Sequence, residues 1–350
     1  MSIPIITVII PIYNEKEYID RCMNSIQSQT HRRLQVILVD GGSDDGSAEI
    51  CDKWGVKWNM GPNSNMGICE VIHTSNQGVS ASRNQGLAHA TGELVTFVDG
   101  DDYLEPDALS RMVEVMTAEN ADMVGCDFAS IYPDGPSKQS KPAEPADSAK
   151  PADLADDTGT EVMSAHDFME KHILHGDLHV WGRLYKRSII GADIRFKQGL
   201  TIGEDMLFVM EYVRRSSVIV HMSYKGYDYF RNPHGAMGKP FTKAAMDQVR
   251  CWEEAKSLLK EYDEELADSN ELKANMLISV MLTACRMALL DKTTRKDEEH
   301  RNYTNVLRSK IKEYKTHKSM KLLDRGYRTK VRLFKAFPGL FMSMYNRHKS

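Results

Sequence analysis

Residues 5–12 have the sequence IITVIIPI, an uninterrupted apolar run rich in β-branched side chains. A strand buried on both faces of a parallel sheet has this pattern, because neither of its faces meets water. Further strands are predicted at 34–40, 68–73, 94–98 and 123–128, with helices between them at 15–29, 45–54, 79–90 and 106–119. This alternation predicts a doubly wound α/β sheet over residues 1–128.

The composition changes abruptly at residues 133–160, which hold 5 of the 12 prolines and almost no large apolar side chain. Such a segment buries too little surface to offset its ordering entropy, so we predict a disordered insertion there. Residues 161–240 are expected to complete the first domain, with helices at 165–174 and 203–214 and strands near 218–221 and 224–230. The apolar spacing of residues 241–350 predicts a separate helical region.

The formal net charge of −4 is distributed unevenly along the 350 residues. Residues 291–350 carry 17 Lys and Arg against 6 Asp and Glu, a net charge of +11, which leaves −15 for residues 1–290. Basic and apolar residues are mixed in the tail that ends this region. A segment of this kind either lies on an anionic membrane surface or packs one face on the catalytic domain. No nucleic-acid-binding motif accompanies the basic cluster, so no nucleic-acid partner is expected.

The sequence shows no targeting segment and no candidate membrane span. The first basic residue, Lys16, follows the first apolar stretch, whereas a secretory signal has its basic residues before it. The longest later uncharged apolar stretch, 274–285, has 12 residues, and a span needs about 18. The 6 cysteines form no C-x-x-C pair, which argues against structural zinc and a disulfide framework. We therefore expect a cytoplasmic protein with reduced thiols.

Ligands of parallel α/β sheets bind beyond the carboxyl ends of the strands, so the loops there are the candidate site. The first such loop contains PIYNE at 11–15, and the second contains VDGGSDDGS at 39–47, where Asp40 can accept hydrogen bonds from a base or a ribose. Neither a G-x-G-x-x-G fingerprint nor a P-loop is present. The loops therefore predict a nucleotide that is held in another way.

The loop that follows the strand at 94–98 carries three carboxylates, Asp99, Asp101 and Asp102, in four residues. Clustered carboxylates repel one another unless a cation lies among them, and a set of oxygen ligands selects Mg²⁺ or Mn²⁺. Taken alone, the same residues also fit a solvated turn with an aspartate that caps the next helix.

Several segments resemble the family 2 glycosyltransferases, which have the GT-A fold. In the order of the chain they are IIPIYNE (9–15), VDGGSDDGS (39–47), NQGVSASRNQGLAHATGE (76–93), FVDGDDYLEPD (97–107), WGRLYKR (181–187), IRFKQGLTIGEDMLF (194–208) and YDYFRNPHGAM (227–237). The resemblance covers roughly residues 5–240. The chain departs from the family pattern at Gly41, where an Asp is usual, and near Gly235 and Ala236, where a small hydroxyl residue is common.

The resemblance implies a GT-A fold, with a mixed and mainly parallel sheet, and a role for each matching residue. It places Pro11, Tyr13 and Glu15 around the nucleoside, Asp40 at the base, Arg83 at the base or ribose, and Arg231 and His234 at the diphosphate. Asp99 resembles the carboxylate on the ribose or metal side, and Asp101 the direct ligand of Mn²⁺ or Mg²⁺. Arg83 also fits a surface ion pair, and Tyr13 a core aromatic.

The same resemblance makes Asp205 the general base that takes a proton from the acceptor hydroxyl. Glu204 and Trp181 are weaker candidates for acceptor contacts, and Trp181 equally fits the core. The implied reaction is inverting transfer of a hexose from a nucleotide sugar, with a UDP-sugar favoured, to a cell-surface polysaccharide or a lipid-linked glycan. Two alternatives are a nucleotidyltransferase, for which no triphosphate loop is found, and a catalytically silent sugar-nucleotide-binding or scaffold protein.

Overall fold

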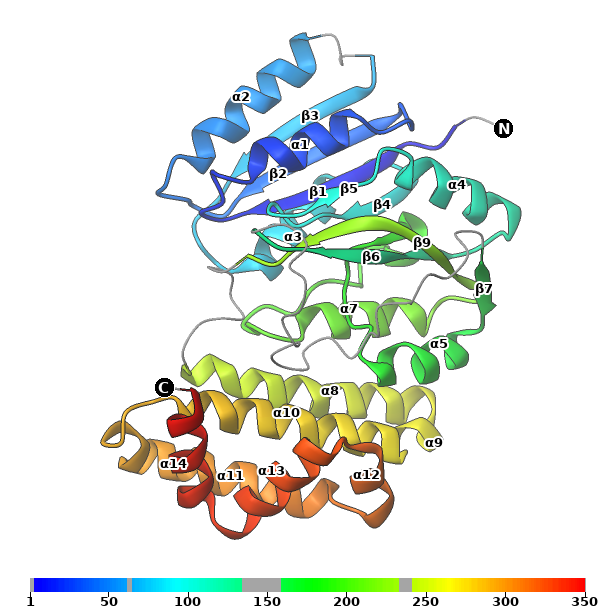
Figure 1. The fold of residues 1–350 in the computed structure, drawn as a ribbon. Coiled ribbons are helices and arrows are strands. Elements are labelled where there is room, and N and C mark those ends of the chain that lie inside the picture. The colour runs from blue at the N-terminus through cyan, green and yellow to red at the C-terminus, as the bar shows by residue number, and fades with distance from the viewer. Residues whose placement is uncertain (1–2, 62–64, 134–158, 233–240, 350) are drawn as a thin grey trace. The chain divides into compact units, whose positions relative to one another are not determined.

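A computed structural model describes residues 3–61, 65–133, 159–232 and 241–349 of the chain (Figure 1). The chain divides into two compact units. The sheet unit comprises Met1–Met169, Asp177–Gly199 and Phe208–Pro233, and the helical unit comprises Glu170–Gly176, Leu200–Leu207 and His234–Ser350. Among the described residues, two short segments of the expected first domain therefore belong to the helical unit. The insertion expected at 133–160 lies largely outside the described residues, although its last residue, Thr160, begins a strand.

The first four long strands form the parallel half of the sheet. They are β1 (Ile6–Ile12), β2 (Leu34–Asp40), β3 (Gly67–His73) and β4 (Leu94–Phe97). Strand β1 lies between β2 and β4, and β2 pairs with β3 on its other side. Every residue of β1 and β2 is buried, as the uninterrupted apolar runs predict. The predicted parallel α/β sheet is confirmed in this half.

The other half of the sheet is mixed. Strand β8 (Arg183–Lys186) runs antiparallel between β4 and β6 (Met123–Ile131), and β9 (Ile219–Phe230) runs parallel to β6. Short strands β5 (Tyr103–Leu104) and β7 (Thr160–Met163) pair with β9 in the antiparallel sense. The strands predicted at 218–221 and 224–230 are thus one strand, and the sheet order is β3-β2-β1-β4-β8-β6-β9-β5.

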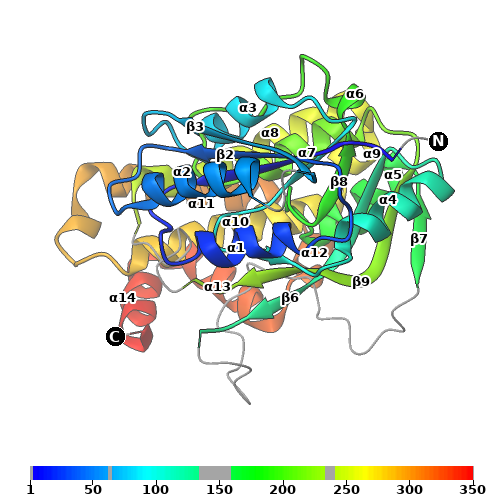
Figure 2. The same ribbon diagram turned by 90° about the horizontal axis from the view of Figure 1, so that it is seen from above.

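Helices cover both faces of this sheet (Figure 2). On one face the alternate β1 residues Ile6, Val8, Ile10 and Ile12 share a core with α1 (Ile19–Gln27), α2 (Ser47–Met60) and α4 (Ala108–Ala118). On the other face α3 (Val79–His89) packs so closely that the Ile9 side chain fills the space beside Gly86. Phe97 adds ring contacts there with Phe196 and Phe208 at 5.2 and 5.5 Å. Strand β1 is buried on both sides because helices pack against both faces of the sheet.

Short helices connect the later strands of the sheet. Helix α5 (Ala165–Lys171) follows β7, α6 (Arg187–Ile190) follows β8, and α7 (Glu204–Val213) precedes β9. The Tyr212 hydroxyl of α7 donates to the carbonyl of Asp122 and accepts from the Lys186 N–H, at 2.7 and 2.8 Å. These two bonds join the end of α7 to the chain before β6 and to β8.

The helical unit is built around α10 (Asn270–Ala288), in which twelve of the 19 residues are buried. Helices α8 (Asp247–Tyr262), α11 (Glu298–Tyr314), α12 (His317–Leu322), α13 (Arg325–Ala336) and α14 (Pro338–Lys349) contact α10 or one another, with short α9 (Glu264–Ala267) after α8 (Figure 1). Side chains of Ser269, Asp297 and Asp324 cap three of these helices. In the described part of the chain, every helix is too short or too polar to span a bilayer.

Candidate active site

The loops after β1 and β2 are tied to each other by side chains. Asn14, which has a positive φ of 55°, accepts the N–H of Asp44 and donates its amide N–H to the Asp44 carboxylate, at 3.0 and 2.9 Å. The N–H groups of Asn14 and Glu15 donate to the hydroxyls of Ser43 and Ser47, at 3.0 and 2.9 Å. This cross-linking fixes where Glu15 and Asp40 lie at the carboxyl edge of the sheet.

Asp40 is buried at the end of β2 and holds the loop that follows it. One carboxylate oxygen accepts the Ser43 N–H and the other contacts His73 Nδ1, both at 3.1 Å. Burial alone would raise the pKa of Asp40, but the hydrogen bonds from Ser43 and His73 outweigh it and lower the pKa. Bonds to Asp40 and Asp52 raise the pKa of His73. Asp40 thus has two protein partners, and its contact with a base stays a prediction.

Pro11 and Tyr13 occupy different environments. Pro11 is buried within β1 opposite Val39, beyond the point where β4 ends its pairing, so its missing N–H leaves no ladder bond unmade. Tyr13 is 48% exposed at the tip of the loop, which argues against the core alternative. Tyr13 is therefore the better placed of the two for a nucleoside, and the contact stays a prediction for both.

The loop after β4 is anchored by Asp102, which is fully buried. Its carboxylate accepts the Tyr227 hydroxyl at 2.6 Å and the Phe230 N–H at 2.7 Å, and both donors belong to β9. The Tyr227 oxygen in turn accepts the N–H of Asp99 at 3.2 Å. Burial, followed by the charges of Asp99 and Asp101, raises the pKa of Asp102 well above its usual value. Asp102 therefore fixes the loop from inside and is not a surface carboxylate.

Asp101 has partners from two other elements. Its carboxylate accepts the Asn232 amide N–H at 3.0 Å, and its backbone carbonyl accepts Arg21 Nη2 of α1 at 2.6 Å. The Arg21 guanidinium lies 4.2 Å from the ring centroid of Phe230 and 4.7 Å from that of Tyr103. Burial raises the pKa of Asp101, and the bond from Asn232 opposes the shift. Arg21 thus positions the loop by bonding to the backbone of Asp101, so the Asp101 carboxylate can bind other partners.

Asp99 forms an ion pair with Arg83 of α3, with Nη2 and Oδ1 2.8 Å apart. Arg83 is 3% exposed and its guanidinium lies 5.3 Å from the Phe196 ring centroid, so the arginine of this pair is buried and does not lie on a helix surface. The pair orients one side of Asp99 while the carboxylate stays partly exposed. The predicted contact of Arg83 with a base or ribose is untested by this geometry.

Glu15 completes a group of four neighbouring carboxyl groups. Its Oε2 atom is buried and has no hydrogen-bond partner among the described residues. Burial, followed by the charges of Asp101, Asp99 and Asp102, raises the pKa of Glu15 well above its usual value. The side chain packs so closely on the loop that a Cβ atom at Gly100 would clash with it. Carboxylate oxygens are the ligands that Mg²⁺ and Mn²⁺ prefer, and the Glu15 oxygen has no partner among the described residues, so the chemistry of these side chains suits a divalent metal.

Other predicted residues of the sheet unit lie among aromatic rings. Arg231 donates to the Ser130 hydroxyl at 3.2 Å and lies 4.7 Å from the Tyr229 ring centroid. Trp181 is 6% exposed and stacks on His179 and Tyr227, with ring centroids 4.1 and 4.4 Å away. This burial favours the core alternative for Trp181 over a sugar platform. His234 lies outside the described residues.

Glu204 and Asp205 stand in the first turn of α7, and by contact they belong to the helical unit. Asp247 of α8 accepts the N–H and the hydroxyl of Thr201 at 3.1 Å, which holds the preceding loop. Gly203 has a φ of +93°, and a Cβ atom there would clash with the side chain of Cys251. The helix dipole favours ionised carboxylates at this end. The base role of Asp205 and the acceptor role of Glu204 stay predictions.

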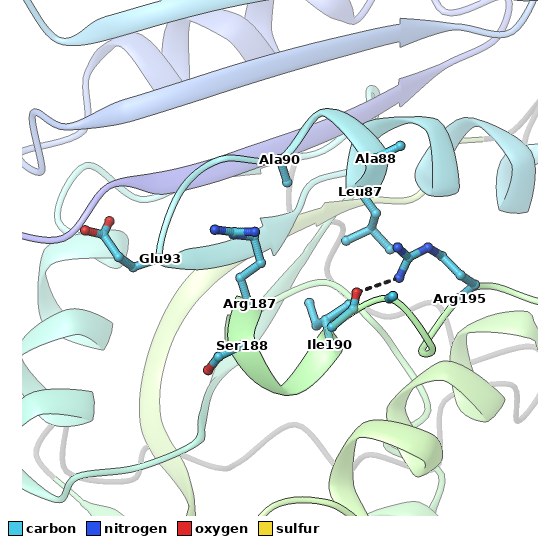
Figure 3. A pocket seen from close by; sticks show the side chains of 10 residues that line it. Leu87, Ala88, Ala90, Glu93, Arg187, Ser188, Ile190 and Arg195 are labelled. Carbon is cyan, nitrogen blue, oxygen red and sulfur yellow. Dashed lines mark hydrogen bonds between the residues drawn. The ribbon is translucent and has the colours of Figure 1, made fainter.

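A cavity of about 560 Å³ lies elsewhere in the sheet unit, between the end of α3 and α6 (Figure 3). Its wall includes Glu93, which precedes β4, whereas the carboxylate loop follows that strand. Two arginines line the cavity, and both have backbone partners: Arg187 Nε donates to the Gly92 carbonyl, and Arg195 Nη1 donates to the Gly191 carbonyl at 3.0 Å. The cavity is therefore separate from the carboxylate site.

The positioning roles of three residues were not predicted from the sequence: Arg21, and Asn232 and Tyr227 of the YDYFRNPHGAM segment. In the sequence, Arg21 is indistinguishable from an exposed residue on an amphipathic helix. Asn232 comes after the end of a strand, where no periodic pattern marks it. Tyr227 belongs to an aromatic run, but its hydroxyl partner is 125 residues away in the sequence. A sequence signal for these contacts would require knowledge of which strands are neighbours.

A comparison with known protein families agrees with the site described at the carboxyl edge of the sheet. A family model described as glycosyl transferase family 2 matches residues 7–190, which include the β1, β2 and β4 loops and β8. The chain belongs to glycosyl transferase family 2. This result confirms the resemblance drawn from the motifs, and it makes the protein a glycosyltransferase.

Individual glycosyltransferases show the same likeness. The chain is 28% identical over 269 residues to the uncharacterized glycosyltransferase EpsJ of Bacillus subtilis (strain 168), a match that covers 77% of this chain and 70% of EpsJ. Among solved structures, S. aureus TarS 1–349 in complex with UDP-GlcNAc has a TM-score of 0.63 at 18% identity, covering 98% of this chain and 91% of that one. The mannosyltransferase PcManGT from Pyrobaculum calidifontis, in complex with GDP-Man and Mn²⁺, has a TM-score of 0.55 at 16% identity, covering 99% and 88%. These two structures show the shared GT-A fold.

The anchoring role of Asp102 predicts opposite effects of substitution at two adjacent residues of this glycosyltransferase. Asp102→Ala leaves the Phe230 N–H buried without an acceptor, so we expect the free energy of unfolding to fall by about 1–3 kcal/mol. Asp101→Ala removes a like charge from the crowded loop and should leave that free energy unchanged or higher. Urea unfolding without metal, followed by circular dichroism, measures both. Equal losses in the two variants would contradict the anchoring role.

The Asp40–His73 pair predicts a pH-dependent stability. The raised pKa of His73 means that its contribution is fully present below the unfolded value of 6.5 and is lost as the pH rises through the folded pKa. The lowered pKa of Asp40 means that its own contribution persists until the pH falls below the unfolded value of 3.8. His73→Gln should therefore destabilise the protein more at about pH 6 than at about pH 9. Urea unfolding at both pH values tests this, and an equal loss would show that the pair does not form.

Proposed function

We propose that this protein is a metal-dependent, inverting hexosyltransferase that uses a UDP-sugar as donor. The observation that carries the proposal is the buried Asp102 anchor, which holds Asp99 and Asp101 at the carboxyl edge of the sheet beside an unsatisfied Glu15 oxygen. The edge is where parallel α/β sheets bind nucleotides. The similarity to TarS, whose structure was solved with UDP-GlcNAc, supports a uridine nucleotide.

The proposed cofactor is Mn²⁺ or Mg²⁺, held by Asp101 and Asp99. When bound, the ion supplies Lewis-acid stabilisation of the charge on the leaving nucleoside diphosphate. The chain's own residues prepare this site: Arg21 fixes the Asp101 backbone, and Arg83 orients Asp99. The mannosyltransferase PcManGT, which shares the fold, was solved with Mn²⁺.

On the donor side, Tyr13, Glu15, Asp40 and Pro11 are proposed to surround the nucleoside. Arg231 and His234 are proposed to donate to the diphosphate oxygens, which suits a guanidinium and an imidazole. The acceptor hydroxyl is proposed to lose its proton to Asp205 as its oxygen attacks the anomeric carbon in line with the departing diphosphate, which inverts the configuration. Glu204 is the further candidate for binding the acceptor.

The acceptor is proposed to be a hydroxyl of a cell-surface polysaccharide or of a lipid-linked glycan. The proposed location is the cytoplasm, with peripheral association at the inner face of the membrane. Support comes from the basic tail, whose charge suits anionic lipid, and from a chain in which no described helix is long and apolar enough to span the bilayer.

The carboxylate arrangement predicts metal-dependent binding of UDP. We expect Asp101→Ala to lose the Mn²⁺-dependent part of UDP affinity, because it removes the proposed metal ligand while Asp102 still anchors the loop. Isothermal titration calorimetry with UDP, in Mn²⁺ and in EDTA, measures the difference. Asp268→Asn, at an exposed acidic residue, is the matched control. Unchanged Mn²⁺-dependent affinity in the Asp101 variant would show that the cluster is a turn.

The base assignment predicts a separation of binding from chemistry. Asp205→Asn should bind UDP as the wild type does but transfer sugar at least about 10²-fold more slowly, because a base acts only on the acceptor. Release of UDP from a panel of UDP-sugars, with and without glycan acceptors, measures turnover. Wild-type turnover would place the base elsewhere. Metal-dependent binding by the wild type without any donor hydrolysis or transfer would instead favour the silent binding protein.

A further inference from the structure

The last two helices carry charge of a single sign. Residues 325–350 include 7 Lys and Arg and no Asp or Glu. Helix α13 holds five of these basic residues, and α14 begins directly after its C-cap residue, Phe337. A surface built from this segment repels cationic partners and attracts anionic ones.

One face of this helix pair is part of the core of the helical unit. Tyr327, Val331 and Phe334 of α13 are buried, at spacings of four and three residues. The Phe334 and Phe341 ring centroids lie 5.4 Å apart, and the Asn346 amide of α14 donates to the Ala288 carbonyl at 2.9 Å. The two helices are therefore fixed elements of the helical unit, and this face of the tail is covered by residues of that same unit.

The other face exposes large apolar side chains. Phe337, Leu340 and Met344 are 62%, 52% and 54% exposed, whereas Phe341, their neighbour in the sequence, is 3% exposed. Leu340 and Met344, four residues apart, lie on one side of α14, and Phe337 is the residue directly before this helix. Arg347, three residues after Met344, is exposed and continues the same stripe. The exposure of this stripe is thus not explained by the packing of the helices.

The neighbouring helix α13 also exposes basic side chains. Arg325 and Arg332 are exposed on the side of α13 away from its buried residues. We propose that Phe337, Leu340 and Met344, together with Arg347 and the exposed Arg325 and Arg332 of α13, form a docking surface for an anionic phospholipid bilayer. Apolar side chains beside basic residues, with no acidic residue among them, match the interface of such a bilayer, where acyl chains meet negative headgroups.

This inference deepens the proposed function. It rests on that function only for its purpose, which is to bring the enzyme to a membrane-associated acceptor. Vesicle binding itself requires neither a donor nor catalysis. Failure of the docking surface therefore leaves the glycosyltransferase proposals intact, and inactivity toward all donors leaves the vesicle result intact.

The test is sedimentation of the full chain with vesicles of phosphatidylglycerol and phosphatidylcholine in equal amounts, and with vesicles of phosphatidylcholine alone. We expect at least about tenfold stronger binding to the anionic vesicles, weakened by salt that shortens the Debye length to about 3 Å at 1 M. The variant F337S/L340S/M344S should bind about tenfold more weakly or worse. The variant R325Q/R332Q/R347Q should lose about fivefold for each charge.

The matched control is V56S/M60S, which removes exposed apolar side chains of α2 in the sheet unit and should bind as the wild type does. Circular dichroism and the thermal midpoint establish that each variant is folded. Equal binding to both vesicle types, or wild-type binding by the two test variants, overturns the proposal. It also fails if the chain ignores vesicles and sedimentation velocity shows a dimer that F337S/L340S/M344S dissociates, because the surface is then an interface between two copies.

Discussion

The buried carboxylate of Asp102, bonded to the Tyr227 hydroxyl and the Phe230 N–H, is the contact on which the candidate site depends. It joins the loop after β4 to β9, which lies across β8 and β6 in the sheet. Placing a carboxylate in the interior is costly unless hydrogen bonds satisfy its oxygens. Because Asp102 is satisfied from within, the loop has one preferred conformation, and Asp99 and Asp101 are held at its outer side.

The anchored loop brings carboxyl groups close together, and the surrounding cationic residues balance their negative charge only in part. Burial and the charges of neighbouring carboxylates, Asp99 among them, raise the pKa values of Glu15, Asp101 and Asp102. The cationic partners come from two helices, Arg21 on α1 and Arg83 on α3. Arg21 is itself held between aromatic rings and reaches a backbone oxygen. A divalent cation bound here would balance this remaining negative charge together with that of a diphosphate.

The sequence predicted those features that depend on local pattern. The buried strands β1 and β2, the parallel half of the sheet and the family follow from apolar runs and from motifs that are contiguous in the chain. The different roles of Asp102, which anchors the loop, and of Asp101, which faces outward, do not follow from local pattern. Both are loop aspartates, and they differ only in their partners, which lie 125 and 131 residues away in the sequence. Strands β5 and β7, with two and four residues, are too short to show a period. Trp181 had two equal interpretations until its stacking partners were known.

The anchoring of the loop by Asp102 and the binding of the proposed metal by Asp101 can be examined together in a crystal grown with UDP and Mn²⁺, with anomalous diffraction recorded at the manganese absorption edge. We expect an anomalous peak bonded directly to the Asp101 carboxylate, with Asp102 still accepting from Tyr227. A peak at a distant group of residues, or an ion coordinated by Asp102 in place of its bonds to β9, would show that these two roles are wrong.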